Sequence, residues 1–243
     1  MDTSLSALSK NSSIPFHSFL ETEVSKSDLE RCIPIAVQFC RNYRCVLYGG
    51  QTASPYVYGY KTLRSATTDL DFICTIDGAR EIVRNEPELF YHPDYDILFC
   101  YRSHIPVTFT VAHIHDCLAG PEVITTAEAV ITDAGPLLCA NREYSIVLKM
   151  RRSEDCLLHR RSIFGKDALD IINIVARAAA DRRPMDYGLV SKLFRAHVTG
   201  DRSEALEICA EITLYESHLP SQDRTLFLDE WGKIVNAVTE GLS

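Results

Sequence analysis

The sequence predicts an α+β fold, in which a mixed sheet flanked by helices is followed by a helical C-terminal half. Apolar and polar residues alternate along residues 106–114, as on a half-buried strand. An apolar run that ends in Gly49-Gly50 reads as a strand followed by a tight turn. From Asn141 onward, apolar residues recur at helical spacing instead. With 243 residues, the chain is long enough for one large domain or two small ones.

The composition changes along the chain and predicts three segments. Residues 1–25 are polar with little periodicity, so we expect an N-terminal arm. Residues 26–140 read as an α/β domain and residues 141–243 as a helical C-terminal domain.

The first elements follow from periodicity and turn residues. Residues 27–42 predict a helix, which we expect to be interrupted near Pro34 because proline lacks the N–H of the helical ladder. Strands are predicted at about 44–48 and 69–76, and a helix at about 78–86.

A strand pair is predicted next, at 96–102 and 106–114. Thr108 and Thr110 occupy the polar side of the second strand. A short strand or helix is expected around 123–131.

The second half predicts helices only. Their expected ranges are 142–152, 165–180, 186–197, 203–216 and 222–240. The helix at 165–180 has the strongest pattern, because its apolar residues keep to one side. These are Ala168, Ile171, Ile172, Val175 and Ala178.

Composition and charge narrow the function. The net charge of −8 argues against a general nucleic-acid coat protein, although a local basic groove remains possible. No apolar run reaches the roughly 18 residues that a membrane helix needs, and no secretory signal is recognisable. The nine cysteines form no C-x-x-C pair and mostly lie in apolar runs. We therefore expect buried thiols without a disulfide partner in a cytoplasmic protein that does not bind a membrane.

A pair of carboxylates is the main candidate for chemistry. Asp69 and Asp71 lie two residues apart on a predicted strand, so both point to one face while Leu70 and Phe72 point into a core. Adjacent carboxylates repel one another unless a cation neutralises them. The Gly-Gly turn offers backbone N–H groups and close approach to an anion. Together these features predict a site for a metal ion and a phosphate.

At this point the sequence resembles the nucleotidyltransferase superfamily with the DNA-polymerase-β-like fold. The motif comprises Gly49-Gly50, Arg64 and Asp69-Leu70-Asp71-Phe72. Downstream, Lys149, Arg160-Arg161 and Lys166-Asp167-Ala168-Leu169-Asp170-Ile171 are similar to a pattern of AbiEii-type nucleotidyltransferases. The resemblance runs from about residue 44 to 178 and implies a nucleotidyltransferase-like sheet.

The resemblance also implies an activity and site residues. The family moves a nucleoside monophosphate from an NTP to a hydroxyl with the help of Mg²⁺, and some members use the tRNA acceptor end. The implied catalytic residues are Asp69, Asp71, Lys149 and Asp167, with Asp69 and Asp71 holding the metal. The implied phosphate-binding residues are Gly49, Gly50, Arg64 and Lys166.

One position departs from the superfamily pattern. Many members carry a third metal-binding carboxylate on a later strand, which here corresponds to residues 106–114. The polar positions of that strand are Thr108 and Thr110. Either Asp167 compensates for the missing carboxylate, or the site is weakened or repurposed.

Residues 142–166 are rich in basic side chains. The candidates for RNA binding are Arg151, Arg152, Arg160 and Arg161. A solvated helix face is the other interpretation of the same residues. In an acidic chain, such a patch suits a small RNA end better than long duplex DNA.

Two other functions remain open. In length and general character the chain also resembles the fungal arginine-containing cyclodipeptide synthases, which use aminoacyl-tRNA and no NTP or metal. Asp69 and Asp71 would then bind a guanidinium through bidentate hydrogen bonds. The second of these other functions is binding without catalysis, by a nucleotidyltransferase-like fold that is catalytically silent. Under the leading hypothesis, the partners are an NTP and an RNA or small-molecule acceptor, with tRNA expected.

Overall fold

A computed structural model describes residues 26–53, 57–59, 69–92, 96–103, 105–112, 120–159 and 165–242 of the chain. The segment 1–25, for which an arm was expected, lies outside these residues. The chain divides into two compact units, Met1–Gln51 with Ser65–Asn141 and Thr52–Arg64 with Arg142–Ser243. The two domains expected at residues 26–140 and 141–243 remain predictions.

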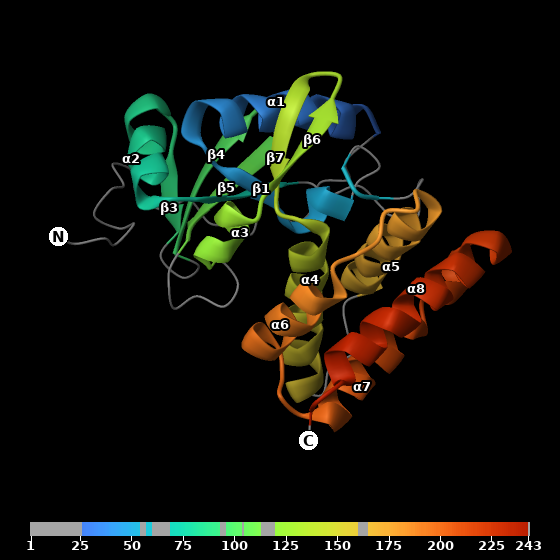
Figure 1. The fold of residues 1–243 in the computed structure, drawn as a ribbon. Helices are drawn as coiled ribbons and strands as arrows, with labels where there is room; N and C mark the ends of the chain where they lie inside the picture. Colours follow the sequence, from blue (N-terminus) through green and yellow to red (C-terminus); the bar gives the residue numbers. More distant parts are fainter. Residues whose placement is uncertain are drawn as a thin grey trace. The chain divides into compact units, whose positions relative to one another are not determined.

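The described part of the first unit contains a seven-stranded sheet with the order β3-β4-β5-β2-β1-β7-β6 (Figure 1). Its strands are β1 (Val46–Tyr48), β2 (Leu70–Cys74), β3 (Phe90–His92), β4 (Ile97–Arg102), β5 (Ile105–Val111), β6 (Glu128–Thr132) and β7 (Gly135–Cys139). The pairs β2–β5 and β1–β7 are parallel, and the other neighbouring pairs are antiparallel. The sheet is therefore mixed, as the sequence predicted.

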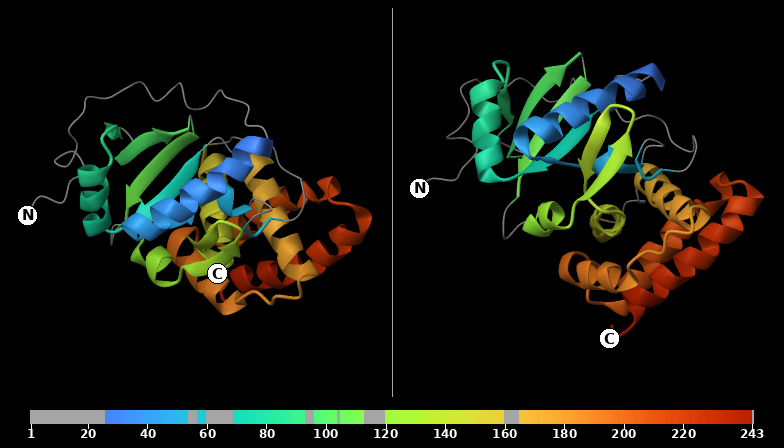
Figure 2. Two further views of the ribbon diagram at one scale, coloured as in Figure 1. Left: turned by 90° about the horizontal axis from the view of Figure 1, so that it is seen from above. Right: turned by 45° about the horizontal axis from the view of Figure 1, so that its top comes forward.

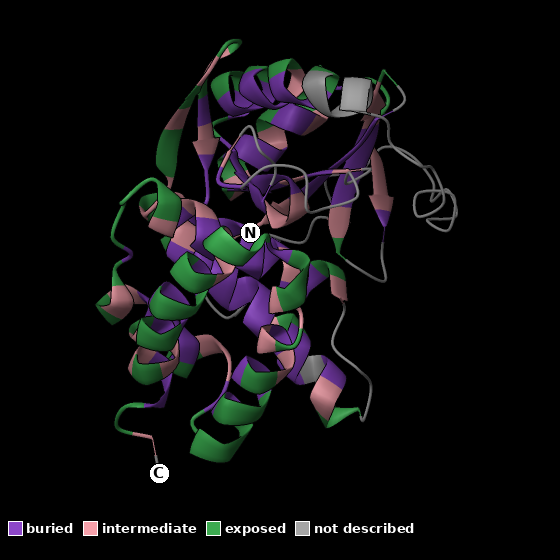
Figure 3. Ribbon diagram, turned by 90° about the vertical axis from the view of Figure 1, so that its right-hand side faces the viewer, coloured by how far each residue is buried: buried purple, intermediate pink, exposed green. Residues whose placement is uncertain are grey.

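Three helices accompany the sheet in the described residues, α1 (Lys26–Tyr43), α2 (Ile76–Asn85) and α3 (Pro121–Thr125). Helix α1 lies across one face of the sheet (Figures 1 and 2). There Phe39 packs on Phe72 and Phe109, with ring centroids 5.7 and 5.3 Å away. These aromatic contacts define the apolar core on this face of the sheet, whose buried residues are purple in Figure 3.

The expected interruption at Pro34 is wrong, because α1 continues through it. Pro34 lies on the exposed side of the helix, where water can satisfy the carbonyl that its missing N–H leaves unpaired. Val37 and Phe39 on the buried side hold the helix on the sheet.

The strand predicted at 69–76 ends earlier, at Cys74. Thr75 begins the next helix instead, since its hydroxyl accepts a hydrogen bond from the Gly78 N–H at 3.1 Å. The ambiguous region at 123–131 contains both alternatives, the end of helix α3 and the start of strand β6.

The described part of the second unit is helical. Its α-helices are α4 (Arg142–Leu158), α5 (Gly165–Ala180), α6 (Tyr187–His197), α7 (Arg202–Thr213) and α8 (Ser221–Thr239). The short 3₁₀ segments are η3 (Gly49–Ala53), which crosses the boundary between the units, and η4 (Glu216–His218). Asp186 and Asp201 cap α6 and α7 by accepting backbone N–H groups. Helix α5 matches its predicted range, and α4 is six residues longer than the expected end at 152.

All eight cysteines in the described residues are buried and form no disulfide. None of the helices in the described ranges is long and apolar enough to cross a membrane. Burial raises the pKa of Cys74, Cys100 and Cys209 to about 12. These thiols therefore stay protonated in the folded chain under conditions in which an unfolded thiol ionises.

We expect stability to fall as the pH rises above 9.0, the value at which an unfolded thiol ionises. The folded chain keeps the thiol proton until about pH 12. Between these two pH values, ionisation of the thiol therefore stabilises the unfolded state relative to the folded state. The expected slope is about 1.4 kcal/mol per pH unit for each such thiol. Urea unfolding of the reduced chain on both sides of pH 9.0 measures it. Cys209→Ala serves as the control, and a slope equal to that of the wild type would refute this origin.

Candidate functional site

Asp71 lies at the centre of the sheet. Its cross-strand neighbours are Tyr48 on β1 and Thr108 on β5, so all three side chains share one face. The Thr108 hydroxyl donates to Asp71 Oδ1 at 2.7 Å. Leu70 and Phe72 alternate with Asp71 and are fully buried, as predicted. Phe72 packs against α1, so Asp71 lies on the opposite face of the sheet.

The Gly-Gly turn directly adjoins this carboxylate. Gly49 has a φ of +73°, a conformation that residues with a Cβ rarely adopt. A Cβ at Gly49 would lie 2.5 Å from Asp71 Oδ2 and 3.2 Å from Asp71 Cβ. The turn and the carboxylate, predicted from separate stretches of sequence, thus meet in space. Asp69 immediately precedes β2 and is half-buried.

The same face carries further hydroxyl groups. Tyr48 Oη and Thr110 Oγ1 share a hydrogen bond of 3.1 Å. Tyr48 was not among the predicted site residues, although its place directly before Gly49 could have indicated it. The strand next to Asp71 therefore provides threonine hydroxyls and no carboxylate on this face, as the sequence predicted.

The donor set suits one kind of metal ion. No group of three His, Cys, Asp or Glu side chains is arranged to hold a metal in the described part of the chain. Asp71 beside the glycine turn, with Asp69 two residues earlier in the chain, matches Mg²⁺, which is usually bound by one or two carboxylates together with substrate phosphates. Asp69 and Asp71 could hold such an ion, and the oxygens of a bound phosphate would add further ligands.

A second cluster lies between α4 and α5 in the helical unit. The Lys149 side chain is buried, and its Nζ donates to Asp170 Oδ2 at 2.5 Å and to Asp167 Oδ1 at 3.4 Å. Arg152 Nη1 lies 3.4 Å from Asp167 Oδ1, with 54% of its side chain exposed. The residues that sequence analysis assigned to catalysis in this unit thus contact one another. Asp170 joins them, and its position three residues after Asp167 on a helix was the available signal.

This second cluster contains an unsatisfied atom. Asp167 is 1% exposed, and its Oδ2 has no hydrogen-bond partner within the described residues. A buried carboxylate oxygen without a donor costs about 1–3 kcal/mol. The catalytic role assigned to Asp167 stays a prediction.

The basic residues predicted to bind RNA or phosphate have different surroundings. Arg151 forms an ion pair with Glu154 on the same helix. Arg152 is exposed and contacts Asp167, and Lys166 is exposed at the start of α5. Arg64, Arg160 and Arg161 lie outside the described residues.

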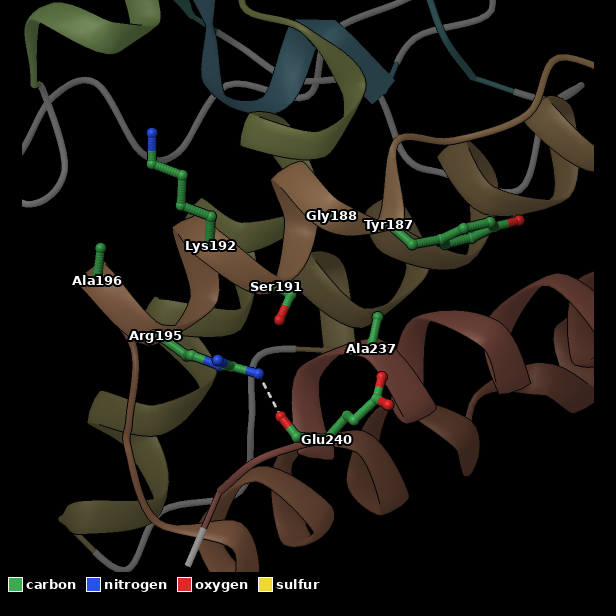
Figure 4. A pocket seen from close by; sticks show the side chains of 8 residues that line it. All are labelled: Tyr187, Gly188, Ser191, Lys192, Arg195, Ala196, Ala237 and Glu240. Atoms are coloured by element: carbon green, nitrogen blue, oxygen red, sulfur yellow. Dashed lines mark hydrogen bonds between the residues drawn. The ribbon is translucent and has the colours of Figure 1, made fainter.

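The helical unit also has a cavity of about 660 Å³ between α6 and the end of α8 (Figure 4). Ser191, Lys192 and Arg195 line it, and Arg195 donates to the backbone carbonyl of Glu240. Figure 4 shows the Lys192 side chain pointing away from Ser191 and Arg195. The cationic groups therefore do not converge on one point, and none of the predicted site residues lines the cavity.

Comparison with known proteins supports the fold. No known family model matches the sequence, and no curated protein matches it. The structure is similar to that of an antigenic nucleotidyltransferase-like protein from Paracoccidioides brasiliensis, with a TM-score of 0.51 and 12% sequence identity. The match covers 79% of this chain and 94% of the other. The chain therefore has a nucleotidyltransferase-like α+β fold, a mixed sheet flanked by helices with a helical C-terminal half.

Proposed function

We propose that this protein is a metal-dependent nucleotidyltransferase that moves a nucleoside monophosphate from an NTP to an acceptor hydroxyl. The observation that carries the proposal is the contact between the Asp71 carboxylate and the Gly49 turn, at the centre of a nucleotidyltransferase-like sheet. Phosphoryl-type transfer depends mainly on positioning and on neutralising charge at phosphate oxygens. A carboxylate and a phosphate-binding turn in contact provide both functions.

Each residue has a defined task in this proposal. Asp69 and Asp71 would hold Mg²⁺, which supplies positive charge to the triphosphate oxygens. The turn at Gly49 and Gly50 lets the triphosphate approach the backbone closely. The acceptor oxygen then bonds to the α-phosphorus, the bond to pyrophosphate breaks, and the hydroxyl proton passes to solvent. Thr108 keeps Asp71 in one orientation during these steps.

We further propose RNA as the acceptor, with the tRNA acceptor end as the leading candidate, as in AbiEii-type enzymes. The exposed Arg152 and Lys166 support this assignment, because both could contact backbone phosphates. The net charge of −8 restricts such contacts to a small patch, which fits the end of an RNA better than a long duplex. The catalytic roles implied for Lys149 and Asp167, which lie in the helical unit, stay predictions.

Asp69→Asn and Asp71→Asn should each reduce transfer of label from an α-³²P-labelled NTP to background. The melting temperature should stay within a few degrees, because losing one of two neighbouring carboxylates also relieves their repulsion. Asp77→Asn is the matched control, since Asp77 is an exposed acid paired with Arg80 on α2. Undiminished transfer by both site variants would contradict the proposed roles.

One observation favours a second candidate, an aminoacyl-tRNA-dependent cyclodipeptide synthase that forms arginine-containing products. Thr108 occupies the position opposite Asp71, so this strand adds no third carboxylate for a metal. In this case Asp69 and Asp71 would bind a guanidinium through charge-assisted hydrogen bonds. Product formation from charged tRNA in the presence of EDTA supports this alternative, whereas activity that resists RNase excludes it.

A further inference from the structure

The hydrogen bond between Thr108 and Asp71 restricts how the site can bind a cation. Thr108 is 6% exposed on a central strand, in register with Asp71. Its hydroxyl hydrogen is directed at Oδ1, while Oδ2 lies over the turn at Gly49. The two carboxylate oxygens therefore have different surroundings, a threonine hydroxyl for Oδ1 and the glycine turn for Oδ2.

We infer that Thr108 is a positioning residue that limits this site to a single divalent cation, held through Asp71 Oδ2. The inference rests on the proposed function, which it deepens by fixing the number of metal ions. A carboxylate that bridges two ions uses both of its oxygens. Because Oδ1 accepts the Thr108 hydrogen bond, a second ion at Oδ1 would have to share that oxygen with the hydroxyl and fit beside the buried Thr108 side chain.

Charge leads to the same conclusion. Two divalent cations at the short separation of a two-metal site repel one another strongly, and nearby carboxylates must offset that repulsion. Asp69 and Asp71 provide two negative charges, and Thr108 provides none at the register position next to Asp71. The local charge thus suits one cation, which the triphosphate would help to hold.

Counting bound Mn²⁺ by electron paramagnetic resonance tests this inference without any turnover. Mn²⁺ alone is titrated into the wild type, and only ions that Asp71→Asn loses are assigned to the site. We expect one such ion in the wild type. Thr108→Val keeps the shape and β-branching but removes the hydroxyl, so Mn²⁺ should bind about tenfold more weakly. Thr108→Ser keeps the hydroxyl and should bind Mn²⁺ like the wild type.

Thr108→Asp supplies the missing charge and should allow a second Mn²⁺ ion. Two assigned ions in the wild type, or equal affinities of the valine and serine variants, would overturn the inference and leave nucleotidyl transfer untouched. Absence of any Mn²⁺ that depends on Asp71 would overturn both the inference and the metal dependence of the proposed function. Transfer of label from an NTP decides the proposed function separately, and circular dichroism verifies that each variant is folded.

Discussion

Gly49→Ala should lower nucleotidyl transfer by at least about 100-fold, the effect expected when catalytic groups move by about 1 Å. The new Cβ would lie 2.5 Å from Asp71 Oδ2, so the carboxylate or the turn must shift. The φ of +73° adds backbone strain, for which we expect a loss of about 1–3 kcal/mol in stability. Label transfer and urea unfolding measure the two effects.

Gly232→Ala is the matched control for this change. Gly232 lies within α8, and a Cβ there meets no atom within 4 Å. Alanine has the higher helix propensity, so this variant should keep full transfer and gain up to about 1 kcal/mol in stability. Full activity of Gly49→Ala would show that the turn is not part of the site.

Lys149→Met should reduce the free energy of unfolding by about 3–5 kcal/mol, because it removes the buried cation that contacts both Asp167 and Asp170. Lys149 Nζ is the donor to Asp170 Oδ2, and Asp170 is fully buried. Methionine retains most of the volume, so the loss reports the missing charge and not a cavity. Urea unfolding at neutral pH measures the change.

A surface ion pair and a compensating substitution serve as controls for this result. Arg177→Gln breaks the exposed pair with Asp181 and should cost no more than about 1 kcal/mol. Adding Asp170→Asn to Lys149→Met removes one of the two buried negative charges that Lys149 contacts and should recover part of the loss. A loss below about 1 kcal/mol in Lys149→Met would show that the cluster contributes little to folding.

The sequence predicted best those elements that local patterns determine. Helix α5 has a continuous apolar side and a match at both ends. Strands β3 and β7 were not predicted. Strand β3, Phe90-Tyr91-His92, is too short to show alternation, and Gly135-Pro136 interrupts the apolar pattern of β7. The strand order was also beyond local patterns, since β1 lies between β2 and the distant β7.

The features of the candidate site were likewise predictable only where local sequence determines them. Asp71 and Thr108 could be assigned to polar faces by alternation alone, and the structure confirms these faces. Their hydrogen bond depends on the register between β2 and β5, which joins positions 37 residues apart. The contact of Lys149 with Asp170 likewise spans 21 residues and depends on how two helices pack. Such long-range geometry follows from tertiary packing and not from local sequence.

The measurement that tests the central claim most directly is calorimetric titration of each NTP into the wild type and Asp71→Asn, with and without Mg²⁺. Nucleotidyl transfer at this site predicts NTP binding that requires Mg²⁺ and disappears in the variant. Binding that is equal in the two proteins, or no binding of any NTP by the wild type with Mg²⁺ present, would contradict the claim.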